Sequence, residues 1–188
     1  MAWTTPGTAT AGEVLTAAFW NTQVRDNTVD LRSYQNRYAR FKRTAGSLTI
    51  NGTSWADLPT VGTTADFTLN ATAGDVVEVA LVASWNSEAV EGFLDFVTVV
   101  GGVVTNSFGA DGAPSNSHGG ILAWRGLSSR FEFLGGSFFR TLAAGDISSG
   151  TVTLRVRART GTAANKTLFA TTDTPLEFWA RNHGPVTT

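Results

Sequence analysis

Cysteine is absent from the 188 residues, which excludes disulfides, zinc sites built from thiolates and a catalytic thiol. The sequence has only two histidines, so a nucleophile–base pair built on imidazole would depend on His118 or His183. The motifs of α/β-hydrolases, zinc proteases, phosphate-binding loops and EF-hands are all missing. We therefore expect no enzymatic activity and no cofactor.

Long apolar runs are missing as well. No segment is long and apolar enough to span a bilayer, and Met1 is not followed by the basic and apolar stretches of a signal peptide. Neither sign of charge dominates, because 14 basic and 15 acidic side chains give a net charge of −1. This balance provides no general attraction to nucleic acid or to a membrane. We expect synthesis in the cytoplasm, with neither nucleic acid nor a membrane as a partner.

The sequence does contain enough apolar material for a substantial core, since 42% of it is hydrophobic and it has 12 Phe and 6 Trp. The charged side chains are distributed unevenly along the chain. Residues 1–43 carry six basic and three acidic side chains, a net charge of +3, whereas residues 44–188 carry eight and twelve, a net charge of −4. This change predicts two parts: an arm and a helix for anchoring and trimerisation over residues 1–46, and a head domain over residues 47–188.

From residue 47 onwards, short apolar stretches alternate with turns rich in Gly, Thr and Asn, which is typical of an antiparallel sandwich or barrel. The predicted fold class is therefore mainly β: a jelly-roll-like β-sandwich preceded by a helix that forms a coiled coil. The predicted strands cover residues 47–50, 65–69, 76–85, 93–100, 103–108, 121–124, 131–139, 151–159, 167–171 and 176–181.

Some of these segments carry further information. The stretch 151–159 alternates cleanly between apolar and polar residues, whereas 76–85 is apolar on both faces, so we expect 76–85 to be central or at a subunit interface. Phe131, Phe133, Phe138 and Phe139 give a similar excess of apolar surface. Ala73-Gly74-Asp75 and Ala144-Gly145-Asp146 look like one turn used twice, with Gly in an unusual φ and Asp bonding neighbouring amides.

Between residues 17 and 41, mainly apolar side chains recur at alternating steps of three and four, the spacing of a heptad seam. A narrow seam needs a partner, and we favour copies of the same helix because a polar Asn27 in the seam would fix the register. The alternative is an amphipathic helix packed on its own domain. We expect this helix to run from a capping box at Thr10 and Glu13 to Arg43, and leave open a break near Asn27. The predicted trimer seam comprises Val24, Asn27, Leu31, Tyr34, Tyr38 and Phe41.

The first half of the predicted helix is apolar around most of its circumference, so it requires burial on nearly all sides. We expect this half to dock on another protein in addition to its own copies. The residues predicted to make the docking contact are Trp3, Val14, Leu15, Phe19 and Trp20.

Several groups of polar residues are predicted to have structural roles rather than to form binding or catalytic sites. The loop 111–120, with Asp111 and His118, is predicted to be a connector rather than a metal or sugar site. The basic residues between 37 and 43 are read as solvated flanks of the coiled coil rather than a nucleic-acid surface. Arg155, Arg157 and Arg159 are read as the polar side of a strand, with binding of an anion or an acidic partner as the alternative. The acidic residues are scattered through turns, which argues against a paired-carboxylate site.

Residues 11–27 resemble a segment near the start of many tailed-bacteriophage virion proteins. The shared residues include Gly12-Glu13-Val14, Thr16-Ala17-Ala18 and Val24-Arg25-Asp26-Asn27, with Trp3 further upstream than in many of those proteins. The rest of the chain resembles the jelly-roll heads of phage fibres and of tumour-necrosis-factor-like trimers. That second resemblance depends on the two Ala-Gly-Asp turns and on the last two strands, at residues 166–169 and 175–179.

The resemblance implies a structural protein of the virion: a homotrimer attached through its N-terminal segment to the major capsid protein or to tail proteins. Because the chain is short and has no repetitive shaft, we expect a capsid decoration protein or a head fibre. The alternative is a tail-fibre or tail-tip protein whose β head binds a host-surface glycan. A glycan-cleaving enzyme is the third and less favoured hypothesis, since it needs two acids facing each other across a groove.

Overall fold

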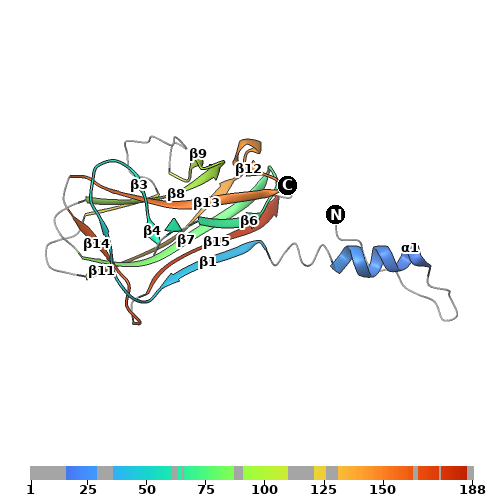
Figure 1. Cartoon of the computed structure of the whole chain (residues 1–188), viewed down its shortest axis with the longest axis horizontal. Helices are drawn as coiled ribbons and strands as arrows, with labels where there is room; N and C mark the ends of the chain where they lie inside the picture. Colours follow the sequence, from blue (N-terminus) through green and yellow to red (C-terminus); the bar gives the residue numbers. More distant parts are fainter. Residues whose placement is uncertain are drawn as a thin grey trace.

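Strands make up most of the chain from Tyr38 onwards, and a short helix precedes them (Figure 1). The computed structural model describes residues 16–28, 36–60, 63–64, 66–86, 91–109, 121–125, 131–162, 165–173 and 175–185. The strands form two antiparallel sheets that pack face to face, so the predicted β-sandwich is confirmed.

The first sheet is organised around β7 (Asp75–Asn86), and we call it the β7 sheet. One edge of β7 pairs with β11 (Phe131–Thr141), and the other is shared by β15 (Leu176–Pro185) and β14 (Lys166–Phe169). Beyond these lie β1 (Tyr38–Arg43) next to β15 and β2 (Leu48–Ile50) next to β14. The stretch predicted to be central because both of its faces are apolar is therefore the central strand of this sheet.

The second sheet is organised around β13 (Thr151–Thr160), and we call it the β13 sheet. Along its edges β13 pairs with β8 (Glu91–Val100), β6 (Asp66–Asn70), β3 (Ala56–Asp57) and β12 (Ile147–Ser148). β8 also pairs with β9 (Val103–Ser107) and β10 (Leu122–Arg125). A separate small hairpin joins β4 (Pro59–Thr60) to β5 (Thr63–Thr64), and η2 (Ala144–Asp146) is a 3-10 turn.

The core lies between the two sheets and follows from strand alternation, because every second side chain of a strand points to the same face. In β13 the apolar residues of the predicted alternation, among them Val152, Leu154 and Val156, are buried. Phe96 of β8 meets Phe178 of β15 edge to face, with ring centroids 6.1 Å apart, and so joins the two sheets. Each such buried aromatic or aliphatic side chain contributes about 1.5–3 kcal/mol to stability.

The predicted helix does not reach Arg43, because residues 38–43 form strand β1. β1 pairs antiparallel with β15, with Tyr38 opposite Arg181 and Arg43 opposite Leu176. Its Ala39 and Phe41 point inward and pack against the core, whereas Tyr38 is exposed. The sheet therefore begins before residue 47, and Tyr38 and Phe41 belong to the sandwich rather than to a helical seam.

Within the described residues the helix begins at Ala17. Thr16 is its N-cap: its backbone is extended, with φ −74° and ψ 157°, and its Oγ1 accepts a hydrogen bond of 3.2 Å from the Phe19 amide. α1 (Ala17–Trp20) continues into the π-helical η1 (Asn21–Asp26), and the helix extends to Thr28. The predicted capping box at Thr10 and Glu13 lies outside the described residues.

Both Ala-Gly-Asp segments are turns in which the aspartate accepts a hydrogen bond from the amide three residues earlier. Asp75 Oδ2 accepts from the Thr72 amide at 3.0 Å, and Asp146 Oδ2 accepts from the Ala143 amide at 2.9 Å. The role predicted for the aspartates is thus confirmed. The role predicted for glycine holds at Gly74, whose φ is +92°, but not at Gly145, which lies in the 3-10 turn without a positive φ.

Candidate functional site

The outer face of the β7 sheet, the one turned away from the core, carries three of the large apolar side chains that are exposed on the sandwich. The strand registers place its residues in three rows that cross β11, β7, β15 and β1 in turn. The first row is Phe139, Glu78, Arg181 and Tyr38; the second is Ser137, Ala80, Trp179 and Arg40; the third is Gly135, Val82, Glu177 and Lys42.

Three large apolar side chains of this face are strongly exposed. Phe139 is 62% exposed, Tyr38 52% and Val82 45%, and they come from three different strands. Trp179 is half-buried beside Tyr38, and their ring centroids lie 6.4 Å apart with planes tilted by 35°. Glu78 and Arg181 stand between Phe139 and Tyr38 in their row, so the apolar contact on this face is the Tyr38–Trp179 pair and not a continuous patch.

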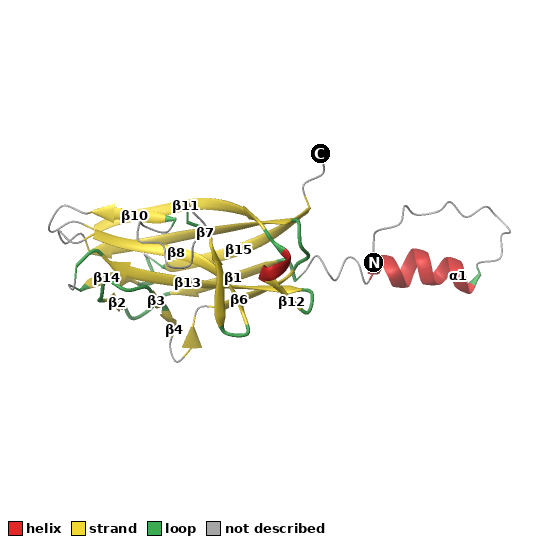
Figure 2. Ribbon diagram, turned by 90° about the horizontal axis from the view of Figure 1, so that it is seen from above, coloured by secondary structure: helices red, strands yellow, loops and turns green. Residues whose placement is uncertain are grey.

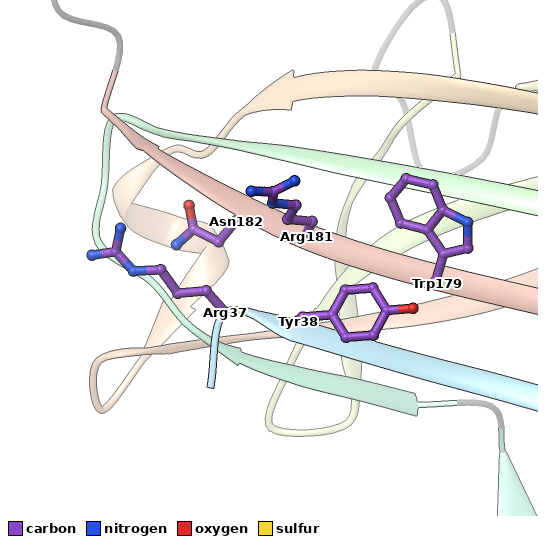
Figure 3. A pocket seen from close by; sticks show the side chains of 5 residues that line it. All are labelled: Arg37, Tyr38, Trp179, Arg181 and Asn182. Carbon is purple, nitrogen blue, oxygen red and sulfur yellow. The ribbon is translucent and has the colours of Figure 1, made fainter. Parts of the chain in front are cut away.

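A pocket of about 530 Å³ opens at the β1–β15 side of this face and is lined by Arg37, Tyr38, Trp179, Arg181 and Asn182 (Figure 3). This volume is within the range of about 300–1,000 Å³ that ligand sites occupy. Tyr38 and Trp179 provide the aromatic walls, and Arg37 and Arg181 provide two cationic groups. The pocket therefore suits an aromatic or acidic group from a partner.

Asn182, one of the residues that line this pocket, is held by hydrogen bonds within the chain. Its Nδ2 donates to the Asn70 carbonyl and to Asp75 Oδ2, each at 2.7 Å, and its Oδ1 accepts from the Gly184 amide at 2.8 Å. The Asn182 amide also donates to the Arg37 carbonyl at 2.8 Å, which extends the β1–β15 ladder. The side chain of Asn182 is thus occupied by its own chain and serves to position the pocket.

The acidic groups of the outer face already have partners. Glu177 Oε2 accepts from Arg40 Nη2 at 2.7 Å, and Glu78 Oε2 lies 2.8 Å from His183 Nε2. Arg181 stands opposite Glu78 in the register, yet within the described part of the chain its side chain has neither a hydrogen bond nor an ion pair. The pocket side of the face is therefore basic.

The outer face of the β13 sheet is polar and paired within the chain. Arg155 bonds Asp66 through Nε at 2.8 Å and Asp57 through Nη1 at 2.8 Å. Arg157 Nη2 donates to the buried Asp95 at 3.1 Å. Arg159 lies over the ring of Phe93, with the guanidinium carbon 4.1 Å from the centroid. The arginine ladder considered as an anion site is therefore engaged by its own chain, in line with the structural interpretation.

Two buried aspartates have pKa values shifted in opposite directions. Burial raises the pKa of Asp95, and hydrogen bonds from Ser107 and Arg157 only partly offset that effect. Burial also acts to raise the pKa of Asp146, but hydrogen bonds from Asn106, Thr98, Ala143 and Thr105 together lower it below the ordinary value. Within the described ranges, no three acidic or histidine side chains come together as a metal site.

The N-terminal helix exposes some of the residues predicted for docking and for the seam. Trp20 is 52% exposed and Val24 is 44% exposed, while Phe19 is half-buried. Asn27, by contrast, is only 4% exposed, so its own chain already covers it. Trp3, Val14, Leu15, Leu31 and Tyr34 lie outside the described residues, as do Asp111 and His118. Figures 1 and 2 both show α1 clear of the sandwich.

Sequence reasoning identified Tyr38 but placed it on the wrong element, and it missed Trp179 and Arg181. A signal was available for Trp179, because Phe178 and Trp179 are adjacent in a strand and must point to opposite faces. One aromatic ring had to be inside and the other outside. Nothing in the sequence indicated that Arg37 and Arg181, 144 positions apart, would line the same pocket.

No protein-family model matches the chain, and no curated protein matches it. Solved structures show a distant similarity of fold. An Eiger TNF from S. frugiperda aligns with 11% identity and a TM-score of 0.36, covering 81% of this chain and 96% of that chain. The VP2 protein of infectious bursal disease virus aligns with 10% identity and a TM-score of 0.37, covering 78% and 36%. A structure described as CBM4 aligns with 15% identity and a TM-score of 0.32, covering 77% and 94%.

None of the described helices has the length and apolar character needed to cross a membrane.

Proposed function

We propose that the chain is a non-enzymatic structural protein of a tailed-phage virion, a homotrimer with a jelly-roll head attached through its N-terminal segment. The position in the virion that we favour is that of a capsid decoration protein or head fibre. The chain would bind by burying apolar side chains against the major capsid protein or a tail protein.

The observation that carries this proposal is the exposure of Trp20 and Val24 on a helix that lies clear of the sandwich. Burying a large apolar side chain is worth about 1.5–3 kcal/mol, so a helix that exposes two of them gains stability from a partner. The resemblance of residues 11–27 to the N-terminal segments of phage virion proteins supports a partner within the virion. The β-sandwich then provides the head that such a segment would attach.

The test measures the mass of the full chain in solution and its attachment to phage particles. Light scattering of the full chain at micromolar concentration is expected to give the mass of a trimer. Trp20→Asp/Val24→Asp is expected to abolish co-sedimentation with particles of the encoding phage that lack the protein. Val103→Asp is the matched control, because Val103 is 67% exposed on β9 of the other sheet. A stable monomer, or equal attachment of all three proteins, would contradict the proposal.

A tail-fibre protein with a glycan-binding head is the competing function. It predicts hits on an array of host-surface glycans and a gene placed among the tail genes. A decoration protein predicts no hits and a gene among the head genes.

A further inference from the structure

The pocket lined by Arg37, Tyr38, Trp179, Arg181 and Asn182 combines aromatic walls with positive charge. The two rings lie on one side of it and the two guanidinium groups lie on the other (Figure 3). None of these described lining residues is acidic, and the Asn182 side chain is engaged within its own chain. The pocket therefore presents two cations and two ring faces to any group that enters it.

Arg181 is the cation of the pocket whose donors are available to a ligand. It is exposed, and in the part of the chain that the structure describes its side chain makes no hydrogen bond and no ion pair. The carboxylate opposite it in the register, that of Glu78, lies 2.8 Å from His183 Nε2 instead. A guanidinium group has five N–H donors and binds a carboxylate through two parallel hydrogen bonds. The donors of Arg181 therefore favour an anionic ligand.

The backbone beside the pocket leaves room for the second cation, Arg37. Gly184 has a φ of +83°, and a Cβ added there would lie 3.2 Å from Arg37 Nη1, closer than ordinary contact. The Arg37 carbonyl also accepts a hydrogen bond of 2.8 Å from the Asn182 amide, which holds this residue beside β15. The fold thus keeps both guanidinium groups at one site.

The rings favour a carboxylate carried on a carbon framework over a bare inorganic anion. Aromatic side chains bury apolar carbon against their faces, and Tyr38 and Trp179 provide two such faces beside the arginines. An acidic side chain can place its methylene carbons against the rings and its carboxylate against the guanidinium groups. Tyr, Trp and Arg are also the residue types most enriched in the energetic centres of protein interfaces. The pocket therefore fits an acidic segment of a protein.

The pocket lies where the N-terminal segment joins the head. Arg37 directly precedes β1, and the described helix reaches Thr28, nine positions earlier. Nine residues span at most roughly 30 Å when fully extended. The end of the helix is therefore within roughly 30 Å of the pocket, and a protein surface that binds the helix lies within reach of the pocket as well.

We infer that the pocket receives an acidic side chain of the same virion protein on which the N-terminal helix docks. The carboxylate lies between Arg37 and Arg181, and its carbon chain lies against Tyr38 and Trp179. This inference rests on the proposed function and adds a charge-dependent contact to the apolar contact of the helix. Because the first contact raises the effective concentration of the second, each of them can be weak.

Attachment to phage particles that lack the protein tests the inference in the full chain. Arg181→Gln and Tyr38→Ala each remove an exposed side chain of the pocket. Both are expected to weaken co-sedimentation about tenfold or more, the effect of losing a charged hydrogen bond or an interface anchor. Lys42→Gln is the matched control, because it removes an exposed cation of the same face outside the pocket, and it is expected to attach normally. All three variants are expected to keep the circular dichroism spectrum of the natural chain.

Salt dependence provides a measurement that a loss of packing alone would not change. Raising the ionic strength from about 0.05 to about 0.5 M is expected to weaken attachment of the natural chain more steeply than that of Arg181→Gln, because this variant lacks one ion pair with the ligand. Tyr38→Ala is expected to keep the natural salt dependence. Parallel salt curves for the natural chain and Arg181→Gln would overturn a carboxylate ligand.

The purified chain can be tested without particles by using benzoate as a probe, since benzoate joins a carboxylate to a ring. Ligand-observed NMR is expected to show saturable binding of benzoate. Binding of benzamide, which has a similar shape and no charge, is expected to be at least about tenfold weaker, as is binding of benzoate to Arg181→Gln. Equal binding of the two probes, or of benzoate to the two proteins, would overturn the assignment of the pocket.

The outcomes separate this inference from the proposed function. Weaker attachment of Arg181→Gln and Tyr38→Ala, with normal attachment of Lys42→Gln, supports it. Normal attachment of both pocket variants, while Trp20→Asp/Val24→Asp fails to attach, overturns it and leaves the proposed function standing. A lower oligomeric mass of Arg181→Gln would assign the pocket to a second copy, and binding of acidic glycans that this variant loses would assign it to a sugar; either result overturns the inference. A natural chain that does not attach to the particles overturns both.

Discussion

Asp95 and Asp146 show how one residue type stabilises the sandwich in two ways. Both are buried, but Asp146 accepts 2.7 and 2.6 Å hydrogen bonds from Thr98 and Asn106, whereas Asp95 accepts from Ser107 at 2.6 Å and faces the charge of Arg157. The pKa of Asp95 is raised, so its ionisation costs stability as pH rises from its ordinary pKa through the folded value. The pKa of Asp146 is lowered, so its contribution is present above the ordinary pKa and is lost as pH falls through the folded value.

These signs predict opposite pH dependences for two amide variants. The natural chain is expected to lose stability between about pH 4 and neutral pH as Asp95 ionises, and Asp95→Asn is expected to lose less over the same range. Asp146→Asn is expected to lose about 3 kcal/mol at neutral pH, because the new amide group would face the Ala143 amide donor. Below about pH 4, Asp146→Asn is expected to lose less stability than the natural chain, because it has no Asp146 carboxylate to protonate. Urea unfolding at a series of pH values measures both. Parallel pH profiles for both variants and the natural chain would contradict the assignment.

Phe41 and Tyr38, neighbours in the predicted seam, have different roles in β1. Phe41 stacks on the buried Phe178, with centroids 6.0 Å apart and planes 18° from parallel. Phe41→Ala is expected to lower the free energy of unfolding by about 3 kcal/mol, since it opens a cavity against the core. Tyr38→Ala is the matched control and is expected to cost less than about 1 kcal/mol, because Tyr38 is largely exposed. Unfolding in guanidinium chloride measures the free energy of unfolding of both variants. Equal losses would contradict the different roles assigned to Phe41 and Tyr38.

At the scale of elements, β1 determines where the folded head starts. It is the outermost strand of the β7 sheet on the side of β15, and its backbone pairs with that of β15 from Tyr38 to Arg43. A chain beginning at residue 36 is expected to fold into a stable head, because it keeps the whole of β1. A chain beginning at residue 47, the predicted boundary, is expected to lose most of its stability and to aggregate, because the edge of β15 is left unpaired. Circular dichroism and light scattering during unfolding check this, and a stable chain from residue 47 would refute it.

The strands after residue 47 could be predicted because alternation and turn chemistry are local signals. Each of the ten predicted strands has a counterpart in the sheets, with limits that differ by a few residues. β1 was missed because its aromatic residues also fit steps of three and four. The competing period of two was present, since Ala39 and Phe41 alternate with Arg40 and Lys42. The pairing partner that decides between the two periods lies far away in the sequence, in β15.

The candidate site could be predicted only in part, for the same reason. Trp20 and Val24 could be found from the sequence because the excess of apolar residues in their helix is local. The pocket could not, because Arg37 and Tyr38 meet Trp179 and Arg181 only through the register of β1 on β15. The short strands β3, β4, β5 and β12 also escaped prediction, since two residues are too few to show a period.

At the scale of the whole molecule, assembly should be visible in stability. For a homotrimer, unfolding is coupled to dissociation, so the unfolding temperature of the full chain is expected to rise with protein concentration. A chain beginning at residue 36 is expected to show a smaller rise, because it retains the heads and lacks the N-terminal helix. Scanning calorimetry over a hundredfold range of concentration measures both. An unfolding temperature of the full chain that stays constant over this range would argue against assembly.

The attachment of the N-terminal segment to β1 has a mechanical consequence. If the segment is held on a particle while drag acts on the head, tension enters the fold at the Tyr38 end of β1 and runs along the strand. The hydrogen bonds between β1 and β15 lie across that direction, so they are loaded together in shear instead of being opened one at a time. The junction where the head meets its tether is thereby built to withstand pulling.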